Sequence, residues 1–200
     1  NIYRKGFLPY SGKSLEKTFY MARSVRIDLT KFTPSSENRR ILRKPTVSLE
    51  RIVTNVLDFD TNDKKFLNFC LQYFEKRHGK GIMNRDRLKY ILNFSEKLQV
   101  VTYTEDDTVL GYVFEVLDKD MSHFWFSFYD LKLVNTSLGM WLLLDMALHA
   151  QKENKKYFYI GTAYGDKGLY KTNFKDLEFW DGNRWVSDVL ILKKLCKVDN

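Results

Sequence analysis

The chain has few of the residues that hold disulfides or metal ions. Its 200 residues include two cysteines, Cys70 and Cys196, and three histidines. Neither cysteine belongs to a C-x-x-C pair, and the histidines have no Cys, His or acidic partners at the spacing of a metal site. We therefore expect no disulfide framework and no metal site, and the low cysteine content fits a reducing cytoplasm.

Long apolar segments are also missing. The longest apolar stretch runs from Gly139 to Leu144 and ends at Asp145, whereas a membrane-spanning helix needs about 20 apolar residues. No secretory apolar segment follows a basic start. We expect a cytoplasmic monomer without a membrane segment. The hydrophobic content of 44% is enough for a core, and the length suits one domain with a small extra lobe.

Positive charge is concentrated at one end of the chain. The formal net charge is +8, and residues 1–50 hold eleven Lys and Arg against four acidic residues. This asymmetry indicates an acidic partner for the N-terminal part, of which nucleic acid is the commonest. A basic face that only contacts solvent is the alternative.

The hydrophobic pattern predicts an α/β fold in which a basic N-terminal lobe, residues 1–55, precedes a main domain, residues 56–200. Strict alternation over 24–29 predicts a half-buried strand, and 37–44 reads as a short basic helix that Pro45 stops. Asn62 would cap a helix that ends at Gly79, with apolar residues at helical spacing between them. The other expected elements are a helix at 85–94, strands at 99–104, 109–117 and 123–129, a buried helix at 137–152, and strands at 157–161 and 185–192.

Three groups of motifs occur in a fixed order along the chain. They are F-T-P-S-S-E-N-R-R-I-L-R at 32–43; F-Y-D at 128–130 followed by S-L-G at 137–139; and Y-I-G at 159–161 followed by K-G-L-Y-K at 167–171, F-K-D-L-E at 174–178 and D-G-N-R-W at 181–185. Together they resemble the C-terminal domain of the arginyl-tRNA–protein transferases and their bacterial leucyl relatives. The resemblance extends from about Arg4 to Trp185.

This resemblance implies a fold, an activity and partners. The fold would be the mixed sheet flanked by helices of the Gcn5-related (GNAT-like) acyltransferases. The activity would be transfer of an aminoacyl group, Leu or Arg, from aminoacyl-tRNA to the N-terminal amine of acceptor proteins that begin with Asp or Glu. Aminoacyl-tRNA would be a co-substrate, and no cofactor is implied.

Two other functions stay open. One is an acetyl-CoA-dependent N-acetyltransferase, and the other is a non-catalytic relative that binds RNA or peptide. Acetyl-CoA enzymes of this superfamily usually carry an R/Q-x-x-G-x-G/A turn where this chain has Asn135–Met140, with a single glycine. That difference argues against CoA.

The chain departs from the family pattern at three places. The N-terminal cysteine motif expected near 19–23 is missing, Leu131 replaces the proline after Asp130, and Thr162 replaces an aromatic residue after Gly161. The loop that begins at Thr162 is also about two residues shorter. Since this loop would border the active site, we expect a changed donor or acceptor preference, or lost activity.

The chemistry of this transfer points to candidate catalytic residues. Asp130, at the end of a strand, would orient the attacking amine or relay its proton, and a capping carboxylate is the alternative. Tyr170 and Lys171 would support the oxyanion or the leaving group, with core packing as the alternative for Tyr170.

Binding residues are expected in the same motifs, in the loop that begins at Thr162 and in the basic cluster at 39–44. The expected substrate-binding residues are Tyr129, Ser137, Gly139, Gly161, Tyr164, Lys167 and Glu178. Ser137 and Gly139 lie at a helix start, where free amides bind anions or carbonyl groups. For Glu178, an ion pair with a buried base is the alternative. The expected tRNA-binding residues, which would neutralise phosphates, are Arg39, Arg40, Arg43 and Lys44.

Overall fold

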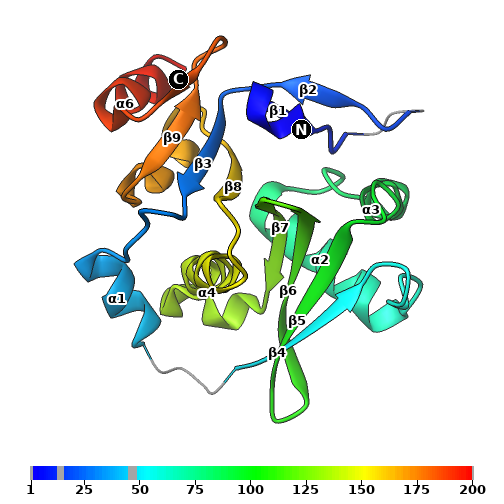
Figure 1. Ribbon diagram of the computed structural model, residues 1–200. Coiled ribbons are helices and arrows are strands. Elements are labelled where there is room, and N and C mark those ends of the chain that lie inside the picture. Colours follow the sequence, from blue (N-terminus) through cyan, green and yellow to red (C-terminus); the bar gives the residue numbers. More distant parts are fainter. Residues whose placement is uncertain (1, 13–15, 45–48, 200) are drawn as a thin grey trace.

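The computed structural model describes residues 2–12, 16–44 and 49–199, and its main element is one mixed β-sheet (Figure 1). Eight strands follow the order β10-β9-β3-β8-β7-β6-β5-β4. All neighbouring strands are antiparallel except β7 and β8, which are parallel. The strands are β3 (Ser24–Asp28), β4 (Glu50–Asn55), β5 (Leu98–Glu105), β6 (Thr108–Asp118), β7 (Met121–Tyr129), β8 (Tyr157–Thr162), β9 (Leu177–Trp180) and β10 (Trp185–Val186). A separate hairpin joins β1 (Phe7–Pro9) to β2 (Phe19–Met21).

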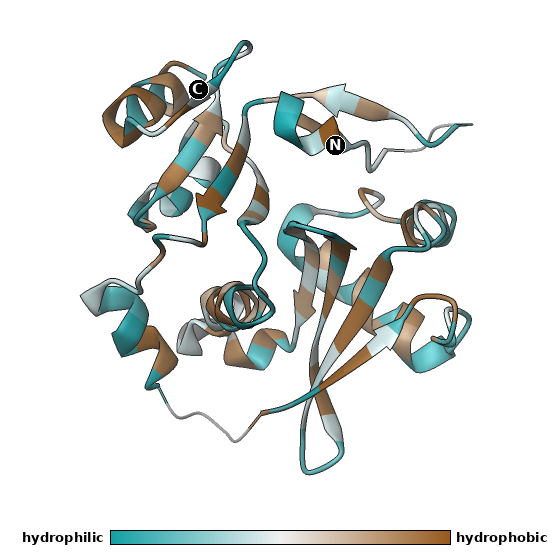
Figure 2. Cartoon of the chain, in the orientation of Figure 1, coloured by the Kyte–Doolittle hydropathy of each residue, from teal (hydrophilic) through white to brown (hydrophobic). Residues whose placement is uncertain are grey.

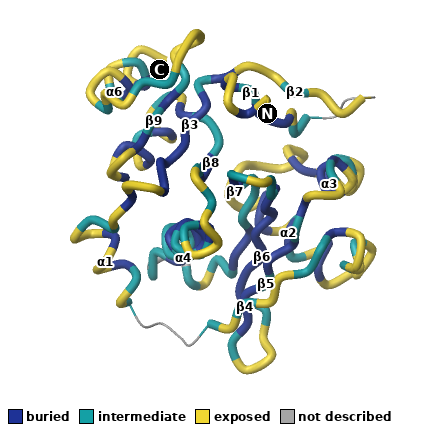
Figure 3. The backbone as a smooth tube through the Cα atoms, in the orientation of Figure 1, coloured by how far each residue is buried: buried dark blue, intermediate teal, exposed yellow. Residues whose placement is uncertain are grey.

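Helices cover both faces of the half of the sheet that contains β5, β6 and β7. Figure 3 shows that α4 is largely buried, whereas the helix nearest the C-terminus is mostly exposed, and Figure 2 colours α4 mainly as apolar. The helices are α1 (Ser36–Leu42), α2 (Lys64–His78), α3 (Arg85–Leu92), α4 (Leu138–Lys152), α5 (Gly165–Gly168) and α6 (Val189–Val198), with 3-10 turns η1 (Ile2–Lys5), η2 (Leu131–Thr136) and η3 (Leu169–Asn173).

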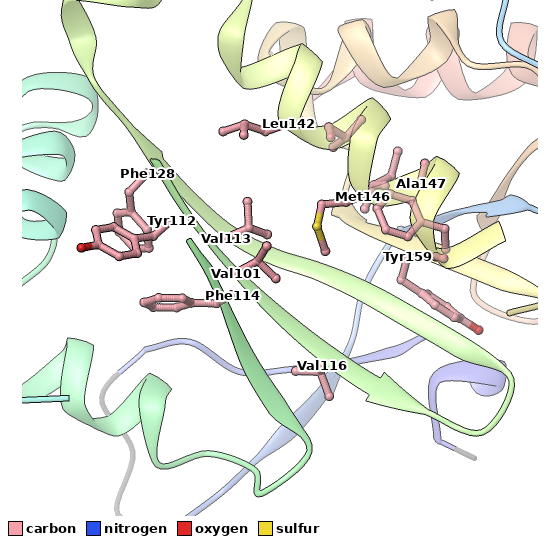
Figure 4. Packing of buried hydrophobic residues seen from close by; sticks show 14 of the residues in the cluster. Val101, Tyr112, Val113, Phe114, Val116, Phe128, Leu142, Met146, Ala147 and Tyr159 are labelled. Atoms are coloured by element: carbon pink, nitrogen blue, oxygen red, sulfur yellow. The ribbon is translucent and has the colours of Figure 1, made fainter. Parts of the chain in front are cut away.

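The core has two layers, one on each face of β6. Tyr112 and Phe114 point toward α2, where the ring centroid of Phe66 lies 4.9 Å from that of Tyr112. Val113 lies on the other face, toward Met146 of α4 (Figure 4). This alternation is the period of two that a strand imposes on its side chains. Each large side chain so buried contributes about 1.5–3 kcal/mol.

The expected α/β fold and most of its elements are confirmed. The strands predicted at 99–104, 109–117 and 123–129 are β5, β6 and β7, and the helices predicted at 85–94 and 137–152 are α3 and α4. The first helix of the main domain is capped one residue later than expected: Asp63 Oδ1 accepts a hydrogen bond from the Phe66 amide at 2.8 Å. Gly79 ends this helix, as predicted.

The strand predicted at 185–192 is wrong. Strand β10 covers only Trp185 and Val186, and helix α6 begins at Val189. Asp188 decides the difference, because its Oδ1 accepts a hydrogen bond from the Leu190 amide at 2.9 Å and so caps a helix. A short apolar run does not by itself distinguish a strand from a helix.

The strand at 24–28 is present, but it is not half-buried. All five residues of β3 are buried because the strand lies between β9 and β8. The strands β1, β2, β4 and β9 were not predicted. Strands β1, β2 and β9 have three or four residues each, too few for a clear alternation. Strand β4 has six residues, but its sequence E-R-I-V-T-N does not alternate between polar and apolar residues.

The boundary predicted after residue 55 coincides with the end of β4. Strands β3 and β4, which precede it, belong to the same sheet as the strands that follow it. The N-terminal segment therefore supplies an inner strand and an edge strand, and its independence as a folding unit stays a prediction. Within the described residues, no helix is long and apolar enough to cross a membrane.

Glu115 is a buried acid in the core, and it makes the stability of the protein depend on pH. Its side chain is 2% exposed and accepts a hydrogen bond from Ser122 Oγ. Burial raises the pKa of Glu115 to about 7, although Ser122, Arg51 and Lys155 favour the charged form. Between pH 4.5 and 7 the folded protein keeps a proton that the unfolded chain loses. The free energy of unfolding therefore falls as pH rises through this window.

We predict that Glu115→Gln changes stability little at pH 5 and raises the free energy of unfolding by about 2–3 kcal/mol at pH 8, because the amide never ionises. Urea denaturation at both pH values measures the difference. The matched control is Glu75→Gln, which removes an exposed carboxylate from α2. An equal effect of Glu115→Gln at both pH values would contradict the prediction.

Candidate active-site cleft

The parallel strands β7 and β8 separate after three paired residues. They pair at Met121 with Tyr157, Ser122 with Phe158 and His123 with Tyr159. Beyond His123, β7 continues to Tyr129 without β8 as a neighbour.

A bulge lies at the point of separation. Phe126 opposes Phe114 and Phe124 opposes Glu115, so Trp125 is an extra residue in β7. A bulge bends its strand and increases the local twist. The bend directs the end of β7 away from β8 and opens space between the two strands.

A cleft of about 770 Å³ occupies this space. Its walls come from β7, the end of β8, the start of α4, the end of α2, the β1–β2 hairpin and the segment that contains α5 and η3. Seven of the residues predicted from the sequence motifs line it: Tyr129, Ser137, Gly139, Gly161, Lys167, Tyr170 and Lys171. The fold thus brings together motifs that are more than forty residues apart in the sequence.

The S-L-G motif forms the junction between η2 and α4. Ser137 has the left-handed backbone conformation, with φ 66° and ψ 25°, and precedes the first residue of α4. A Cβ atom on Gly139 would lie 2.8 Å from Cε1 of Tyr129, which is too close for a non-bonded contact. Glycine therefore lets the helix start pack directly against the buried ring of Tyr129.

Lys171 is a buried cation in the cleft. Its side chain is 8% exposed, and its Nζ donates a hydrogen bond to the Thr162 carbonyl oxygen. Burial lowers the pKa of Lys171 to about 8. Gly161 lies beside it, because a Cβ on Gly161 would be 3.5 Å from Nζ. An amine with this pKa can both donate and accept a proton near neutral pH.

The cleft is lined by basic side chains and by no described carboxylate. Arg77 and His78 come from the last turn of α2, and Lys167 and Lys171 come from the segment after β8. His78 is close to this charge: burial first, and then the charges of Arg77, Lys167 and Arg87, lower its pKa. Such a site favours a negatively charged ligand. Within the described part of the chain, no group of three or more His, Cys, Asp or Glu residues is arranged to hold a metal ion.

Three of the predicted catalytic and substrate-binding residues, Asp130, Tyr164 and Glu178, do not line the cleft. Asp130 directly follows Tyr129, and its Oδ1 accepts a hydrogen bond from the Lys132 amide at 2.9 Å, which caps η2. Tyr164 is 47% exposed, and its hydroxyl accepts a hydrogen bond from the Arg23 amide at 2.8 Å. The capping alternative for Asp130 is thus observed, while its catalytic role stays a prediction.

Glu178 forms an ion pair with the buried Arg26. Such a pair was the predicted alternative to substrate binding for this residue. Nε of Arg26 lies 2.7 Å from its Oε2. The guanidinium of Arg26 lies 3.7 Å from the ring centroid of Tyr157 and 3.9 Å from that of Trp185. This contact joins β3, β8, β9 and β10, so Glu178 contributes to the sheet, and its role in substrate binding is a prediction.

The four predicted tRNA-binding residues lie outside the cleft, on α1 and just after it. Arg39, Arg40 and Arg43 are exposed, and Arg40 forms an ion pair with Glu37 at 2.6 Å. Lys44 is closer to the cleft, because its Nζ donates a hydrogen bond to Ser137 Oγ at 3.1 Å. The basic helix therefore ends at the edge of the cleft.

Other residues of the cleft had no recognisable signal in the sequence. Tyr20 lies in a strand too short to predict, Tyr73 follows the apolar pattern of α2, and Arg77 looks like an ordinary basic residue in a last helical turn. His123 is the first residue of its predicted strand. Only the tertiary arrangement places these four side chains in one cleft.

The sequence of residues 36–175 matches the family model of the acetyltransferase (GNAT) domain. The chain belongs to this family. It is similar to the aspartate/glutamate leucyltransferase of Saccharophagus degradans, with 29% identity over 180 residues that cover 86% of this chain and 73% of the relative. The enzyme of the same name from Dinoroseobacter shibae is 31% identical, with 81% and 61% covered. The resemblance to the aminoacyl-tRNA–protein transferases is confirmed, and the chain spans 73% and 61% of the length of these two relatives.

Solved structures support the fold. FemX superposes with a TM-score of 0.54 and 10% identity, covering 80% of this chain and 58% of FemX. L-PGS from Bacillus licheniformis superposes with a TM-score of 0.52 and 14% identity, covering 71% and 45%. The predicted GNAT-like mixed sheet with flanking helices is confirmed.

We predict that Gly139→Ala lowers the free energy of unfolding by about 1–2 kcal/mol, because the new methyl group forces the buried ring of Tyr129 to move. In an uncrowded helix the same change would be stabilising by up to about 1 kcal/mol. The sign of the measured change therefore shows whether the contact with Tyr129 or helix propensity dominates. Urea denaturation measures it. In a Tyr129→Leu background, which removes the crowded ring, the loss should disappear. Stabilisation by Gly139→Ala alone would show that the contact is not restrictive.

Proposed function

We propose that the chain transfers a leucyl group from aminoacyl-tRNA to the N-terminal amine of proteins that begin with Asp or Glu. The main support is the composition of the cleft, in which cations from two segments meet and no described carboxylate is present. An acidic acceptor residue and the phosphates of a tRNA end are both negatively charged. The names of the similar enzymes, aspartate/glutamate leucyltransferases, support the donor and the acceptor.

The reaction needs mainly positioning and proton transfer. The aminoacyl ester is already activated, and an α-amine, with a pKa of roughly 7.7–8.0, is partly neutral near pH 7. The amine nitrogen attacks the ester carbonyl carbon, the bond to the ribose oxygen breaks, and that oxygen takes a proton. Holding the two reactants together supplies much of the acceleration.

Lys171 and Tyr170 support the chemical step in this proposal. Lys171, with a pKa of about 8, exchanges a proton with the reacting amine or the leaving ribose oxygen. Burial raises the pKa of Tyr170 to about 12, so its hydroxyl stays protonated and donates a hydrogen bond to an oxygen of the ester. Both side chains line the cleft.

Arg77 and Lys167 hold the acidic side chain of the acceptor. They come from α2 and α5, and both line the cleft. A guanidinium binds a carboxylate through two parallel hydrogen bonds, which gives geometric selectivity as well as attraction. Tyr129, Ser137, Gly139 and Gly161 shape the remaining wall, with Tyr164 and Glu178 as proposed contributors from outside the lining.

The tRNA approaches along α1 in this proposal. The exposed Arg39, Arg40 and Arg43 neutralise phosphates, and Lys44 continues the basic surface to Ser137 at the edge of the cleft. The exposed aromatic ring of Tyr20 at the cleft offers a stacking surface for an unpaired base.

One experiment separates this function from its rivals. The purified chain is incubated with Leu-tRNA, Arg-tRNA or acetyl-CoA and with peptides that begin with Asp, Glu or Ala, and the products are identified by mass spectrometry. We expect leucyl transfer to the Asp and Glu peptides only. Acetylation of the peptides would instead support the N-acetyltransferase, and binding without any transfer would support the non-catalytic relative.

We predict that Asp130→Asn lowers the turnover of aminoacyl transfer by about 10²-fold, as expected when a group that holds or relays a proton is lost. The substitution tests the charge of Asp130 alone. Asn caps a helix start about as well as Asp, so the η2 cap is retained and only the negative charge is removed. Steady-state kinetics measures the effect, and thermal unfolding checks the fold. Turnover near the wild-type value would reduce Asp130 to its capping role.

We predict that replacing Arg39 and Arg40 together with Ala weakens tRNA binding and reduces the slope of log K against log salt by about one to two, at roughly 0.9 per lost duplex-phosphate contact and less for single strands. Filter binding over a salt series gives the slope. The matched control, Lys194→Ala with Lys197→Ala, removes two exposed charges from α6. Equal slopes for the control and the α1 variant would place the tRNA elsewhere.

A further inference from the structure

His123 occupies the point at which β7 and β8 separate. It is the last residue of β7 that pairs with β8, opposite Tyr159. Its side chain is 1% exposed and is part of the lining of the cleft. None of the roles proposed above uses it.

The two nitrogens of the His123 ring have different surroundings. Nδ1 lies 3.2 Å from the hydroxyl oxygen of Tyr3 in the N-terminal turn η1. Nε2 is buried and has no hydrogen-bond partner among the described residues. An unpaired buried nitrogen costs about 1–3 kcal/mol, and such atoms are rare in native proteins unless a ligand or water contacts them. Because His123 is one of the residues that line the cleft, a ligand in the cleft is the partner that fits.

The Tyr3 hydroxyl determines which nitrogen carries the proton. The ring is neutral near pH 7, since burial and the charge of Lys171 lower the pKa of His123 to about 3. Burial raises the pKa of Tyr3 well above its ordinary value, so its hydroxyl stays protonated. A phenol is a stronger donor than an imidazole N–H, and an imidazole nitrogen is a stronger acceptor than a phenol oxygen. Tyr3 therefore donates to Nδ1, and the ring proton is on Nε2.

We propose that Nε2–H of His123 donates a hydrogen bond to the carbonyl oxygen of the aminoacyl ester and stabilises the oxyanion formed during transfer. This inference rests on the proposed function and adds to it a catalytic residue outside the three groups of family motifs. When the acceptor nitrogen attacks, the carbonyl π electrons move to the oxygen that Nε2–H holds. The intermediate then collapses, the amide forms, the ribose oxygen leaves, and the proton lost by the amine is balanced by the proton gained by that oxygen.

A neutral donor suits this role. The ring keeps the same proton throughout, so it stabilises the developing charge without a reorganisation of its own. Lys171, whose charge acts on His123, adds electrostatic support from the same wall. The donor is also rigidly held, because the backbone of His123 pairs with Val116 of β6 on one side and with Tyr159 of β8 on the other.

The kinetic test compares two variants of His123. We expect His123→Leu, which removes the donor, to lower the turnover of leucyl transfer by about 10²–10³-fold, with little change in KM for Leu-tRNA or for the acceptor peptide. His123→Gln, which restores an N–H, should recover at least tenfold of that loss. The control is His149→Leu, which changes a partly buried histidine bonded to Arg51 and should leave turnover unchanged. Thermal unfolding verifies that each variant folds.

Nuclear magnetic resonance supplies a readout that does not depend on activity. In protein labelled with ¹⁵N-histidine, the long-range ¹H–¹⁵N pattern should show His123 protonated at Nε2 and accepting at Nδ1, and a stable amide analogue of leucyl-adenosine should shift the Nε2–H resonance. A proton on Nδ1, or full turnover in His123→Leu, would overturn the assignment. If the wild-type protein transfers no leucine, the proposed function fails; if it does and His123→Leu transfers equally well, only the role of His123 fails.

Discussion

The short parallel pairing of β7 and β8 is the constraint on which the rest of the site depends. Three residue pairs hold the strands together, and the bulge at Trp125 then bends β7 away. A longer pairing would close the sheet and leave no cleft. The start of α4 faces the opened space, and it packs closely there because residue 139 is glycine beside the ring of Tyr129. The backbone geometry of one strand thus determines where the cleft opens.

The same arrangement explains the electrostatics of the cleft. Lys171 and His123 are both buried at its walls. Burial lowers the pKa of each side chain and so favours its neutral form. Arg77 and Lys167 add charge that no described carboxylate of the lining balances. In the sheet, by contrast, the buried guanidinium of Arg26 is paired with Glu178. Unbalanced basic groups in a cleft, next to paired ones in the sheet, are typical of a binding site for an anion.

The sequence predicts correctly those helices and strands whose hydrophobic pattern extends over many residues. Helices α2 and α4 and the meander from β5 to β7 follow from periodicity, and Gly79 marks the end of α2 correctly. The C-terminal helix α6 was read as a strand, because a short apolar run is ambiguous and the cap at Asp188 went unrecognised. Strands of three or four residues, such as β2 and β9, carry too little pattern to be predicted.

The candidate site was predictable only where motifs marked it. Ser137, Gly161 and Lys171 line the cleft as expected, whereas Asp130 caps a turn beside it. Arg77 and His123 could not be found from the sequence. Their positions in the cleft depend on how α2 packs against β7 and on the residue at which β8 separates from β7. Both features belong to the tertiary structure and leave no local pattern in the sequence.

We propose that the cleft between β7 and β8 binds the reacting aminoacyl end of the tRNA. The most direct measurement is a crystal structure of the protein with the stable amide analogue of leucyl-adenosine. We predict that the analogue lies between the two strands, with its carbonyl oxygen next to His123 and its leucyl amide near Lys171 and Tyr170. An analogue bound at another surface, with this cleft empty, would contradict the account.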